Sequence, residues 1–285
     1  MSVTLRAGTP ADTEPCGRIC YDAFTNISTK HNFPPDFPSP DVATGFLRWI
    51  FEHPRFYVVV AERDGKIVGS NCLDERDAIA GVGPITVDPT VQNAAVGRQL
   101  MQAVLDRAEQ QNAVGVRLVQ AAFHNRSLSL YTKLGFDVRE PLACMQGEPI
   151  QRTIPGFAVR PAVLADLDAC NRVCREVHGV ERANETRDMI EQGLASVVER
   201  GGRVTGYAST IGFFGHAVGE TNDDLKALIA AAPTFHGPGF LLPTRNADLF
   251  RWCLQNGLRV TQPMTLMSLG LYHPPTTPFL PSITY

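Results

Sequence analysis

The chain has 285 residues, which is long enough for two domains of about 140 residues each. Hydrophobic residues make up 44% of the sequence and charged residues 19%, and the formal net charge is −3. These values predict a globular protein. They argue against nucleic acid or an anionic membrane surface as a partner, because both require a basic face.

The sequence also lacks the signals of export and of membrane insertion. No run approaches the roughly 18 consecutive apolar residues of a membrane span, and the N-terminal stretch has no apolar signal core. We therefore expect a cytoplasmic protein. Its seven cysteines are then expected to be reduced thiols.

Strands and helices alternate in the first half of the chain, and strands are the more numerous. We expect, in order, a strand at 3–8, a helix opened by Asp12, a hairpin over 56–74 that turns at Asp64-Gly65, a strand at 81–87, a helix at 97–112, a strand at 114–123, a short helix at 125–135 and closing hairpin strands at 136–147. The segment 24–40, rich in proline and aromatic residues, is too irregular for an element. This order predicts an α/β or α+β domain.

The second half of the chain repeats the first. Five residues of the first predicted helix region recur 154 positions later: Arg6, Asp12, Cys16, Arg18 and Cys20 match Arg160, Asp166, Cys170, Arg172 and Cys174. Gly65 and Gly69 match Gly202 and Gly206 at an offset of 137, and Gly135, Pro141 and Met145 match Gly257, Pro263 and Met267 at an offset of 122. The chain is therefore a tandem duplication whose second copy has lost residues twice. We place the boundary in the segment 147–156, which gives domains at 1–148 and 149–285.

The paired cysteines could suggest a metal site, because His178 follows Cys174 by four positions. However, Phe24 stands at the matching position of the first copy, and the cysteines lie among apolar residues. We expect small buried side chains and no metal.

The segment QNAAVG, at residues 92–97, leads from the strand at 81–87 into the next helix. The first turn of a helix has unpaired backbone N–H groups and a partial positive charge, and small residues let an anion approach them. Arg98 adds a full charge beside this loop. The residues alone leave two possibilities open, a pyrophosphate site and an ordinary connection. An alanine at position 95 is compatible with the negative φ of a first helical turn.

Two motifs resemble those of the GNAT superfamily of acyl-CoA N-acyltransferases. The first is V-x-P-x-x-Q-x-x-A-x-G-R-x-L over 87–100, which is similar to motif A, usually Gln/Arg-x-x-Gly-x-Gly/Ala. The second, at 125–136, resembles N-x-x-A-x-x-L-Y-x-x-x-G-F, with Leu128 in place of a small residue. The resemblance implies two tandem GNAT-type domains of bacterial type, each with a mixed, mostly antiparallel sheet flanked by helices, of which the second is degenerate.

The resemblance also implies acetyl-CoA as the co-substrate and assigns the residues that bind it. The expected contacts come from the strand residues Ile85, Thr86 and Val87, the loop and helix residues Gln92, Asn93, Ala94, Ala95, Val96, Gly97 and Arg98, and Asn125. Tyr131 is expected to act as the general acid, because a phenol and a thiol have comparable acidities.

The general base and the acceptor site are less closely defined by the motifs. Asp74 and Glu75, after the second hairpin strand, are the candidate bases, and His124 is a weaker one. The acceptor is expected to contact the segment between the first two helices, including His31, Phe33, Asp36 and Phe37, unless that segment only packs on the second domain.

The second copy lacks the residues that these roles require. Glu220, Asp223 and Asp224 stand at the helix start, where carboxylates would repel a pyrophosphate. Ala247 and Cys253 stand where the first copy has Asn125 and Tyr131; a slip of one residue gives Asn246 and Trp252. We therefore expect the first domain to be the catalytic one.

The sequence thus predicts an acetyl-CoA-dependent N-acetyltransferase acting on the primary amine of a small molecule by direct attack. The chain is expected to be a monomer or a homodimer. A non-catalytic acyl-CoA sensor is the alternative, and a pure assembly module that binds no CoA is a third possibility.

Overall fold

The computed structural model describes residues 3–91 and 95–284. The predicted cofactor residues Gln92, Asn93 and Ala94 lie outside this described part. Contacts between Cα atoms divide the chain into two compact units. The first unit consists mainly of residues up to Leu118 together with His124–Gly135, and the second of Val119–Phe123 together with Phe136–Ile283.

The sheet of the first unit is mixed and mostly antiparallel. Its strands are β1 (Thr4–Ala7), β2 (Phe56–Arg63), β3 (Lys66–Asp74), β4 (Ile79–Val82) and β6 (Gly115–Ala121), in that spatial order. β4 and β6 run parallel, and the other neighbours are antiparallel. The hairpin of β2 and β3 turns at Asp64-Gly65, where both residues have positive φ, as the sequence predicted.

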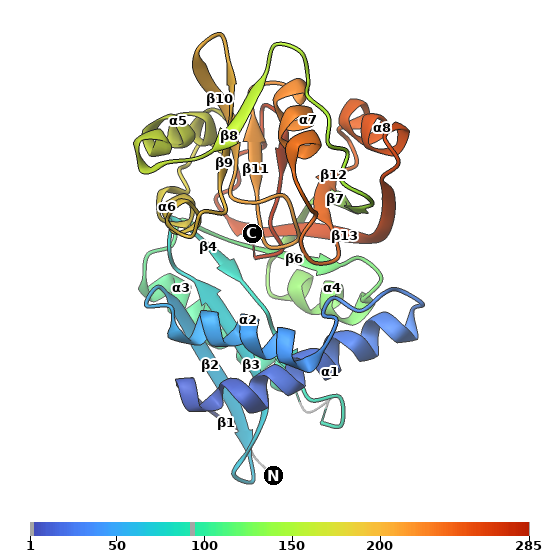
Figure 1. Cartoon of the computed structure of the whole chain (residues 1–285). Coiled ribbons are helices and arrows are strands. Elements are labelled where there is room, and N and C mark those ends of the chain that lie inside the picture. The colour runs from blue at the N-terminus through green and yellow to red at the C-terminus, as the bar shows by residue number, and fades with distance from the viewer. Residues whose placement is uncertain (1–2, 92–94, 285) are drawn as a thin grey trace. The chain divides into compact units, whose positions relative to one another are not determined.

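Four α-helices accompany this sheet. They are α1 (Thr13–Lys30), α2 (Pro40–Glu52), α3 (Val96–Gln110) and α4 (Asn125–Lys133). In Figure 1, α1 and α2 cross in front of β2 and β3. The periodicity of α3 predicts a buried face of Leu100, Met101, Val104, Leu105 and Ala108. Four of these residues are at most 3% exposed, whereas Leu105 is half-buried.

The structure corrects three elements expected from the sequence. The irregular segment 24–40 begins as helix, because α1 continues to Lys30. The strand expected at 81–87 is two strands, β4 and β5 (Thr86–Val87), with Gly83-Pro84 between them; proline has no N–H to continue a ladder. The closing hairpin expected at 136–147 is one long strand, β7 (Asp137–Gln146).

The second unit contains two groups of strands (Figure 1). A five-stranded antiparallel sheet has the order β14 (Phe279–Leu280), β11 (Ala217–Gly219), β10 (Arg203–Ala208), β9 (Ser196–Arg200) and β8 (Ala158–Pro161). A second ladder contains β7, β12 (Phe240–Pro243) and β13 (Arg259–Gly270). The helices are α5 (Leu167–His178), α6 (Ala183–Glu191), α7 (Asn222–Ala231) and α8 (Ala247–Gln255).

Strand β7 belongs to the first copy by sequence but to the second unit by its contacts. It lies between β12 and β13 and pairs antiparallel with both, with Met145 opposite Phe240 and Val260. The continuous part of the second unit therefore begins at Phe136, whereas the boundary proposed from the sequence lies at 148/149.

The repeated residues of the two copies make equivalent contacts. Arg6 binds Asp12 and Glu62, with Nη2 2.7 Å from an oxygen of each. Arg160 binds Asp166 and Glu199 in the same way, with both distances again 2.7 Å. The hydrogen bonds from Arg6 are the main cause that lowers the pKa of Asp12 to about 2. These ion pairs tie the first strand of each copy to the following turn and strand.

The same steric constraint explains why both matched positions, Gly69 and Gly206, are occupied by glycine. A methyl group added at Gly69 would lie 2.6 Å from the carbonyl oxygen of Thr86 in β5. A methyl group at Gly206 would lie 2.7 Å from the carbonyl oxygen of Val218 in β11. Both distances are too short for a Cβ atom, so each glycine allows the next strand to approach closely.

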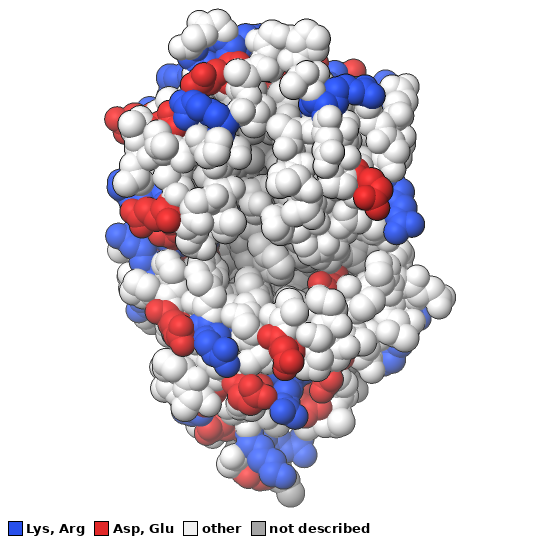
Figure 2. Space-filling view, in the orientation of Figure 1, with Lys and Arg blue, Asp and Glu red and all other residues white. Residues whose placement is uncertain are grey.

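All seven cysteines are free thiols and buried, including Cys16, Cys20, Cys170 and Cys174, for which the sequence predicted burial. In the described part of the chain, no helix has the length and apolarity to cross a membrane. The face shown in Figure 2 carries acidic and basic side chains interspersed with one another.

Helix α3 begins with an unusual backbone conformation. Its N-cap residue, Ala95, has a φ of 58° and a ψ of 13°, which lie in the left-handed region. The negative φ expected for this alanine is therefore wrong. A methyl side chain in this region costs about 1–2 kcal/mol, which is the physical reason that glycine is favoured there.

We predict that Ala95→Gly leaves the free energy of unfolding unchanged or raises it by up to about 1 kcal/mol. The relief of left-handed strain is partly offset by the larger entropy of glycine in the unfolded chain. Urea unfolding measures the change. The control is Ala103→Gly within α3, which should lower the same free energy by about 1 kcal/mol. An equal loss in both variants would contradict the left-handed conformation.

The second unit also contains a fully buried polar network. The imidazole of His216 contacts Glu185 through Nδ1 at 3.1 Å and the Tyr207 hydroxyl through Nε2 at 2.8 Å. Thr186 contacts the same hydroxyl at 3.4 Å. All four side chains are at most 4% exposed, so α6, β10 and the start of β11 are joined by hydrogen bonds that water cannot replace.

We predict that Tyr207→Phe lowers the free energy of unfolding by about 1–3 kcal/mol, because it removes a hydrogen-bond partner from buried His216 and Thr186. Thermal melting followed by circular dichroism measures the loss. Tyr21→Phe, on half-exposed Tyr21 of α1, serves as the control and should change the melting temperature little. Equal effects of the two substitutions would show that the network adds no stability.

Candidate functional site

Three segments of the sequence motifs meet around Gly97 in the first turn of α3. A methyl group added to Gly97 would lie 3.8 Å from Val87 Cγ2 in β5 and 3.8 Å from Leu130 Cδ2 in α4. These are ordinary contact distances, so protein atoms alone leave room for a methyl group here. The structure thus brings the helix start, the end of β5 and the α4 motif together.

Strand β5 pairs with β3 on one side, through Val87 with Gly69 and Thr86 with Ser70. β6 instead pairs with β4, at Ile79, Ala80 and Gly81. Among the described residues, β5 has no strand partner on its other side. Its backbone groups are therefore available to hydrogen-bond an extended ligand, as the resemblance implied for Ile85, Thr86 and Val87.

The N-terminus of α3 carries a net positive character. Its N-cap is Ala95, which has no side-chain oxygen to accept the first N–H groups, and its first turn contains no acidic residue. Arg98 lies in this turn and is exposed. Unpaired N–H groups, the helix dipole and a guanidinium therefore favour an anion at this helix start.

The corresponding helix of the second unit begins differently. Asp224 at the third position of α7 accepts hydrogen bonds from the backbone N–H and the hydroxyl of Thr221, at 2.8 and 2.7 Å. Thr205 donates a further hydrogen bond to Asp224. The helix start of the second unit is thus satisfied by the protein's own carboxylate.

The connections that precede the two helices differ in length as well. Residues 88–95 separate β5 from α3, whereas only residues 220–221 separate β11 from α7. The strands occupy equivalent places, because Asp88 and Glu220 donate their backbone N–H groups to Val68 and Thr205 in the same manner. The second unit therefore lacks the loop itself.

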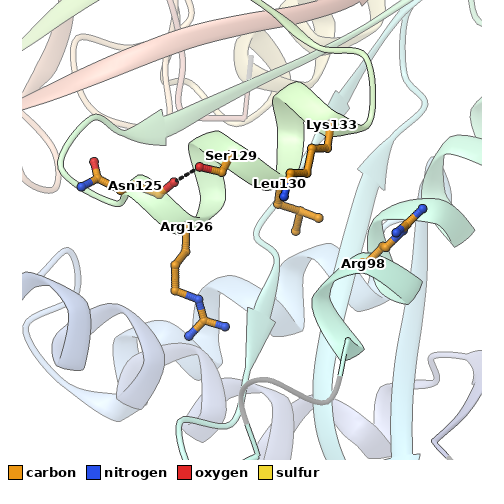
Figure 3. Close-up of a pocket in the computed structure, with 6 residues that line it drawn as sticks. All are labelled: Arg98, Asn125, Arg126, Ser129, Leu130 and Lys133. Atoms are coloured by element: carbon orange, nitrogen blue, oxygen red, sulfur yellow. Dashed lines mark hydrogen bonds between the residues drawn. The ribbon is translucent and has the colours of Figure 1, made fainter.

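An open groove of about 460 Å³ lies beside the start of α3. Arg98 lines it from α3, and Asn125, Arg126, Ser129, Leu130 and Lys133 line it from α4. Figure 3 shows Leu130 and Lys133 on the part of α4 nearest to Arg98, with Arg126 about one turn nearer the helix N-terminus. Among the described residues, three cationic and no acidic side chains line this groove, which suits a ligand with several negative charges.

Tyr131 is the one buried residue of α4, at 7% exposure. Burial raises the pKa of Tyr131 well above the ordinary value of a phenol. The hydroxyl is consequently protonated throughout the neutral range and is able to donate a proton or a hydrogen bond. This raised pKa departs from the near-balance of phenol and thiol acidities expected from the sequence.

His124 is the N-cap residue of α4 and is half-buried. Its pKa is lowered, mainly by burial and further by the nearby charges of Arg126 and His31. The imidazole is therefore neutral at neutral pH and has a nitrogen lone pair to accept a proton.

The two carboxylates named as candidate bases are both held by arginines. Asp74 accepts hydrogen bonds from Arg76 Nε at 2.9 Å and Nη2 at 2.6 Å. Glu75 accepts bonds from Arg107 Nε at 2.6 Å and Nη2 at 2.9 Å. In each pair the guanidinium contacts both oxygens of the carboxylate, so neither carboxylate is free of a protein partner.

The residues expected at the acceptor site have unlike surroundings. His31 is exposed and its Nδ1 bonds the carbonyl oxygen of Ile27 at 2.9 Å. Phe33 is half-buried. Phe37 is 5% exposed, with its ring 6.1 Å from that of Phe24 and 6.0 Å from that of Phe46. Phe37 therefore packs α1 against α2, and only His31 and Phe33 of these three remain accessible.

Sequence reasoning did not single out Arg126, Ser129 or Lys133 as ligand contacts. The signal was available, because positions 126, 129, 130 and 133 follow the i, i+3, i+4, i+7 spacing of one helix face. The sequence did not show that this face of α4 lies beside the first turn of α3. Among the described residues, no cluster of three or more His, Cys, Asp or Glu side chains is arranged to hold a metal.

Comparisons with known proteins agree with this geometry. Residues 21–136 match the family model described as Acetyltransferase (GNAT) family. A curated relative described as IAA acetyltransferase from Azospirillum brasilense is 26% identical over 99 residues. That match covers 34% of this chain and 65% of the relative, so it spans slightly less than two-thirds of the relative's length.

Two solved structures match nearly the whole chain. The GCN5-related N-acetyltransferase from Sphaerobacter thermophilus has a TM-score of 0.64 at 17% identity and covers 95% of this chain and 96% of its own. A tandem GNAT protein from the clavulanic acid biosynthesis pathway has a TM-score of 0.57 at 12% identity, with coverages of 94% and 98%. Residues 21–136 thus match the model of the GNAT family, and the fold of the chain as a whole is similar to that of a solved tandem GNAT protein.

Proposed function

We propose that the chain transfers an acetyl group from acetyl-CoA to the primary amine of a small-molecule acceptor, and that the first copy, residues 1–148, carries the active site. The observation that supports this most strongly is the contrast between the two helix starts. α3 is left without an acid or a side-chain cap, whereas α7 is closed by Asp224. A pyrophosphate supplies the negative charge that the start of α3 lacks.

The residues around Gly97 fit the parts of an extended thioester donor. The start of α3, Arg98 and the cationic groove would hold the phosphates, and Asn125 lies at the same groove. The backbone of β5 would pair with the amide groups of the pantetheine arm and polarise the thioester carbonyl. We include the loop residues 92–94 in this site on the motif resemblance alone.

The proposed reaction is a direct transfer. The amine nitrogen forms a bond to the acetyl carbonyl carbon while the carbon–sulfur bond breaks. Tyr131 gives its phenolic proton to the departing sulfur, and a base takes a proton from the amine. Among the candidates we favour His124 as this base over Asp74 and Glu75, because its imidazole is neutral and the carboxylates are held by arginines.

One observation favours the alternative of a non-catalytic acyl-CoA sensor. The burial that raises the pKa of Tyr131 makes proton transfer to a thiolate less favourable than from an exposed phenol. A sensor would use the same groove to bind the donor without transferring its acyl group. Turnover measurements separate the two functions.

We predict that Tyr131→Phe lowers kcat by about 100-fold or more, the usual contribution of a general acid, while the Kd for CoA changes less than about threefold. An amine screen with a thiol-release assay measures the rate, and calorimetry measures the binding. Tyr57→Phe, on β2, is the matched control and should leave both values unchanged. Full turnover by Tyr131→Phe on every accepted amine would remove the general-acid role. A chain that binds CoA but acetylates no amine would support the sensor instead.

We predict that kcat/KM falls on the acidic side with a midpoint below the usual imidazole value of about 6.5, because the pKa of His124 is lowered and only the neutral form accepts a proton. His124→Gln should lower kcat/KM by about 100-fold near neutral pH and remove this acidic limb. The pH profiles of both proteins test it, with exposed His273→Gln as the control. An unchanged acidic limb in His124→Gln would exclude this histidine as the base.

A further inference from the structure

A buried amide group in β3 makes a hydrogen bond to the backbone of helix α3. The side chain of Asn71 is fully buried, and its Nδ2 donates to the carbonyl oxygen of Leu100 at 3.2 Å. The same nitrogen lies 3.5 Å from Sδ of Met101, the next residue of the helix. A carbonyl oxygen has two lone pairs, so Leu100 can accept this bond beside the one within the helix. Asn71 thus joins β3 to α3 about one turn after the helix start.

A second contact fixes the orientation of this amide. Asn71 Oδ1 accepts a hydrogen bond from the backbone N–H of Cys72 at 2.9 Å. A rotation of the amide by half a turn would place its NH2 group against this N–H and its oxygen against the carbonyl of Leu100. Both contacts would then be repulsive. The side chain therefore holds one carbonyl of α3 at a defined position relative to β3.

The second unit joins the equivalent strand and helix at a different place. An offset of 137 puts Ala208 at the position of Asn71 and Thr205 at that of Val68. Ala208 has no polar side-chain atom. Thr205 is fully buried and donates a hydrogen bond to Asp224, the residue that also closes the start of α7. In the second unit, the bond between strand and helix therefore uses the same carboxylate that occupies the helix start.

The position of the Asn71 contact suits a helix whose first turn binds an anion. The N-cap of α3, Ala95, has no side-chain cap, and the first turn has no acidic residue. A contact at Leu100 secures the helix without using the N–H groups of that turn. The ion pair of Glu75 with Arg107 also joins the end of β3 to α3, but it lies about 10 Å further along the helix. Asn71 therefore acts on the end of α3 at which a phosphate would bind.

We propose that Asn71 is a positioning residue for the acyl donor, and that it holds the first turn of α3 where its N–H groups meet the pyrophosphate of acetyl-CoA. This inference rests on the proposed function, because it needs the donor to bind at that helix start. Asn71 is buried between β3 and α3, so it acts through the helix and does not touch the ligand.

A purely structural role for Asn71 makes a different prediction. Loss of either buried contact, Asn71 with Leu100 or Thr205 with Asp224, should lower the melting temperature. If Asn71 only stabilises the fold, its replacement should affect donor binding no more than the replacement of Thr205. A positioning role instead weakens donor binding only when the contact to α3 is lost.

The test uses three variants of the full chain. Asn71→Ala introduces the residue that the second unit has at this position. Asn71→Asp keeps the shape of the side chain and the acceptor for Cys72, but its carboxyl can donate to Leu100 only when it is protonated. Thr205→Val is the matched control, because it removes the corresponding strand-to-helix bond of the second unit.

Calorimetry measures the Kd for CoA, and steady-state kinetics on an accepted amine measures kcat and the KM for acetyl-CoA. We expect Asn71→Ala to raise Kd and KM by about five- to tenfold, while kcat changes less than about twofold, because β5 and Tyr131 are unaltered. In Asn71→Asp, the weakening of binding should grow as the pH rises and the carboxyl ionises. Thr205→Val should lower the melting temperature and leave Kd, KM and kcat unchanged.

Three results would overturn the inference while leaving the proposed function intact. The first is an unchanged Kd for CoA in the folded Asn71 variants. The second is an equal rise of Kd in Thr205→Val. The third is failure of both Asn71 variants to fold, which would make the role of Asn71 structural. Thermal melting of each variant shows whether it is folded. If the wild type binds no CoA, the proposed function and this inference fail together.

Discussion

Every helix begins with backbone N–H groups that its own hydrogen bonds cannot satisfy, and the two units of this chain meet that constraint in opposite ways. The second unit closes the start of α7 internally, with Asp224 accepting hydrogen bonds from Thr205 and Thr221. The first unit begins α3 at Ala95, without a side-chain cap, and places Arg98 in the first turn. The N–H groups at the start of α7 are therefore paired within the protein, whereas those at the start of α3 are left to accept an anion.

The surroundings of this helix start extend the difference between the units. α4 of the first unit brings Asn125, Tyr131 and a row of exposed cations to the groove beside α3. α8 begins at Ala247, the counterpart of Asn125, and carries buried Cys253 where α4 has Tyr131. The second copy has kept the helices, but its α8 has neither the amide of Asn125 nor the phenol of Tyr131 at these positions.

The second copy nevertheless remains necessary to the fold of the first. β7, the closing strand of the first copy, has β12 on one side and β13 on the other, and both belong to the second copy. A chain without residues 149–285 would leave both edges of β7 without these partners, and exposed strand edges promote aggregation.

The residues that the two copies share make steric or ionic contacts that hold neighbouring strands together. Gly69 and Gly206 each allow the following strand to approach to a distance that a methyl group would prevent. The Arg6 and Arg160 ion networks hold the first strand of each copy to the same two neighbours. These contacts explain why the repeat is visible in the sequence at all, since steric and charge complementarity at these points cannot be relaxed in either copy.

Local patterns in the sequence determined the tandem repeat, the β2–β3 hairpin at Asp64-Gly65 and most of the buried stripe of α3, because turn chemistry and periodicity act over a few residues. The mixed sheet was implied by the family resemblance. Only the tertiary structure decided that β7 pairs with strands of the second copy, since a strand's sequence does not specify its partner. It also decided that Ala95 is left-handed, that Asp74 and Glu75 are held by Arg76 and Arg107, and that Phe37 lies in the core. Those outcomes depend on which side chains distant in the sequence come within a few ångströms, and that information lies in the packing of the whole unit.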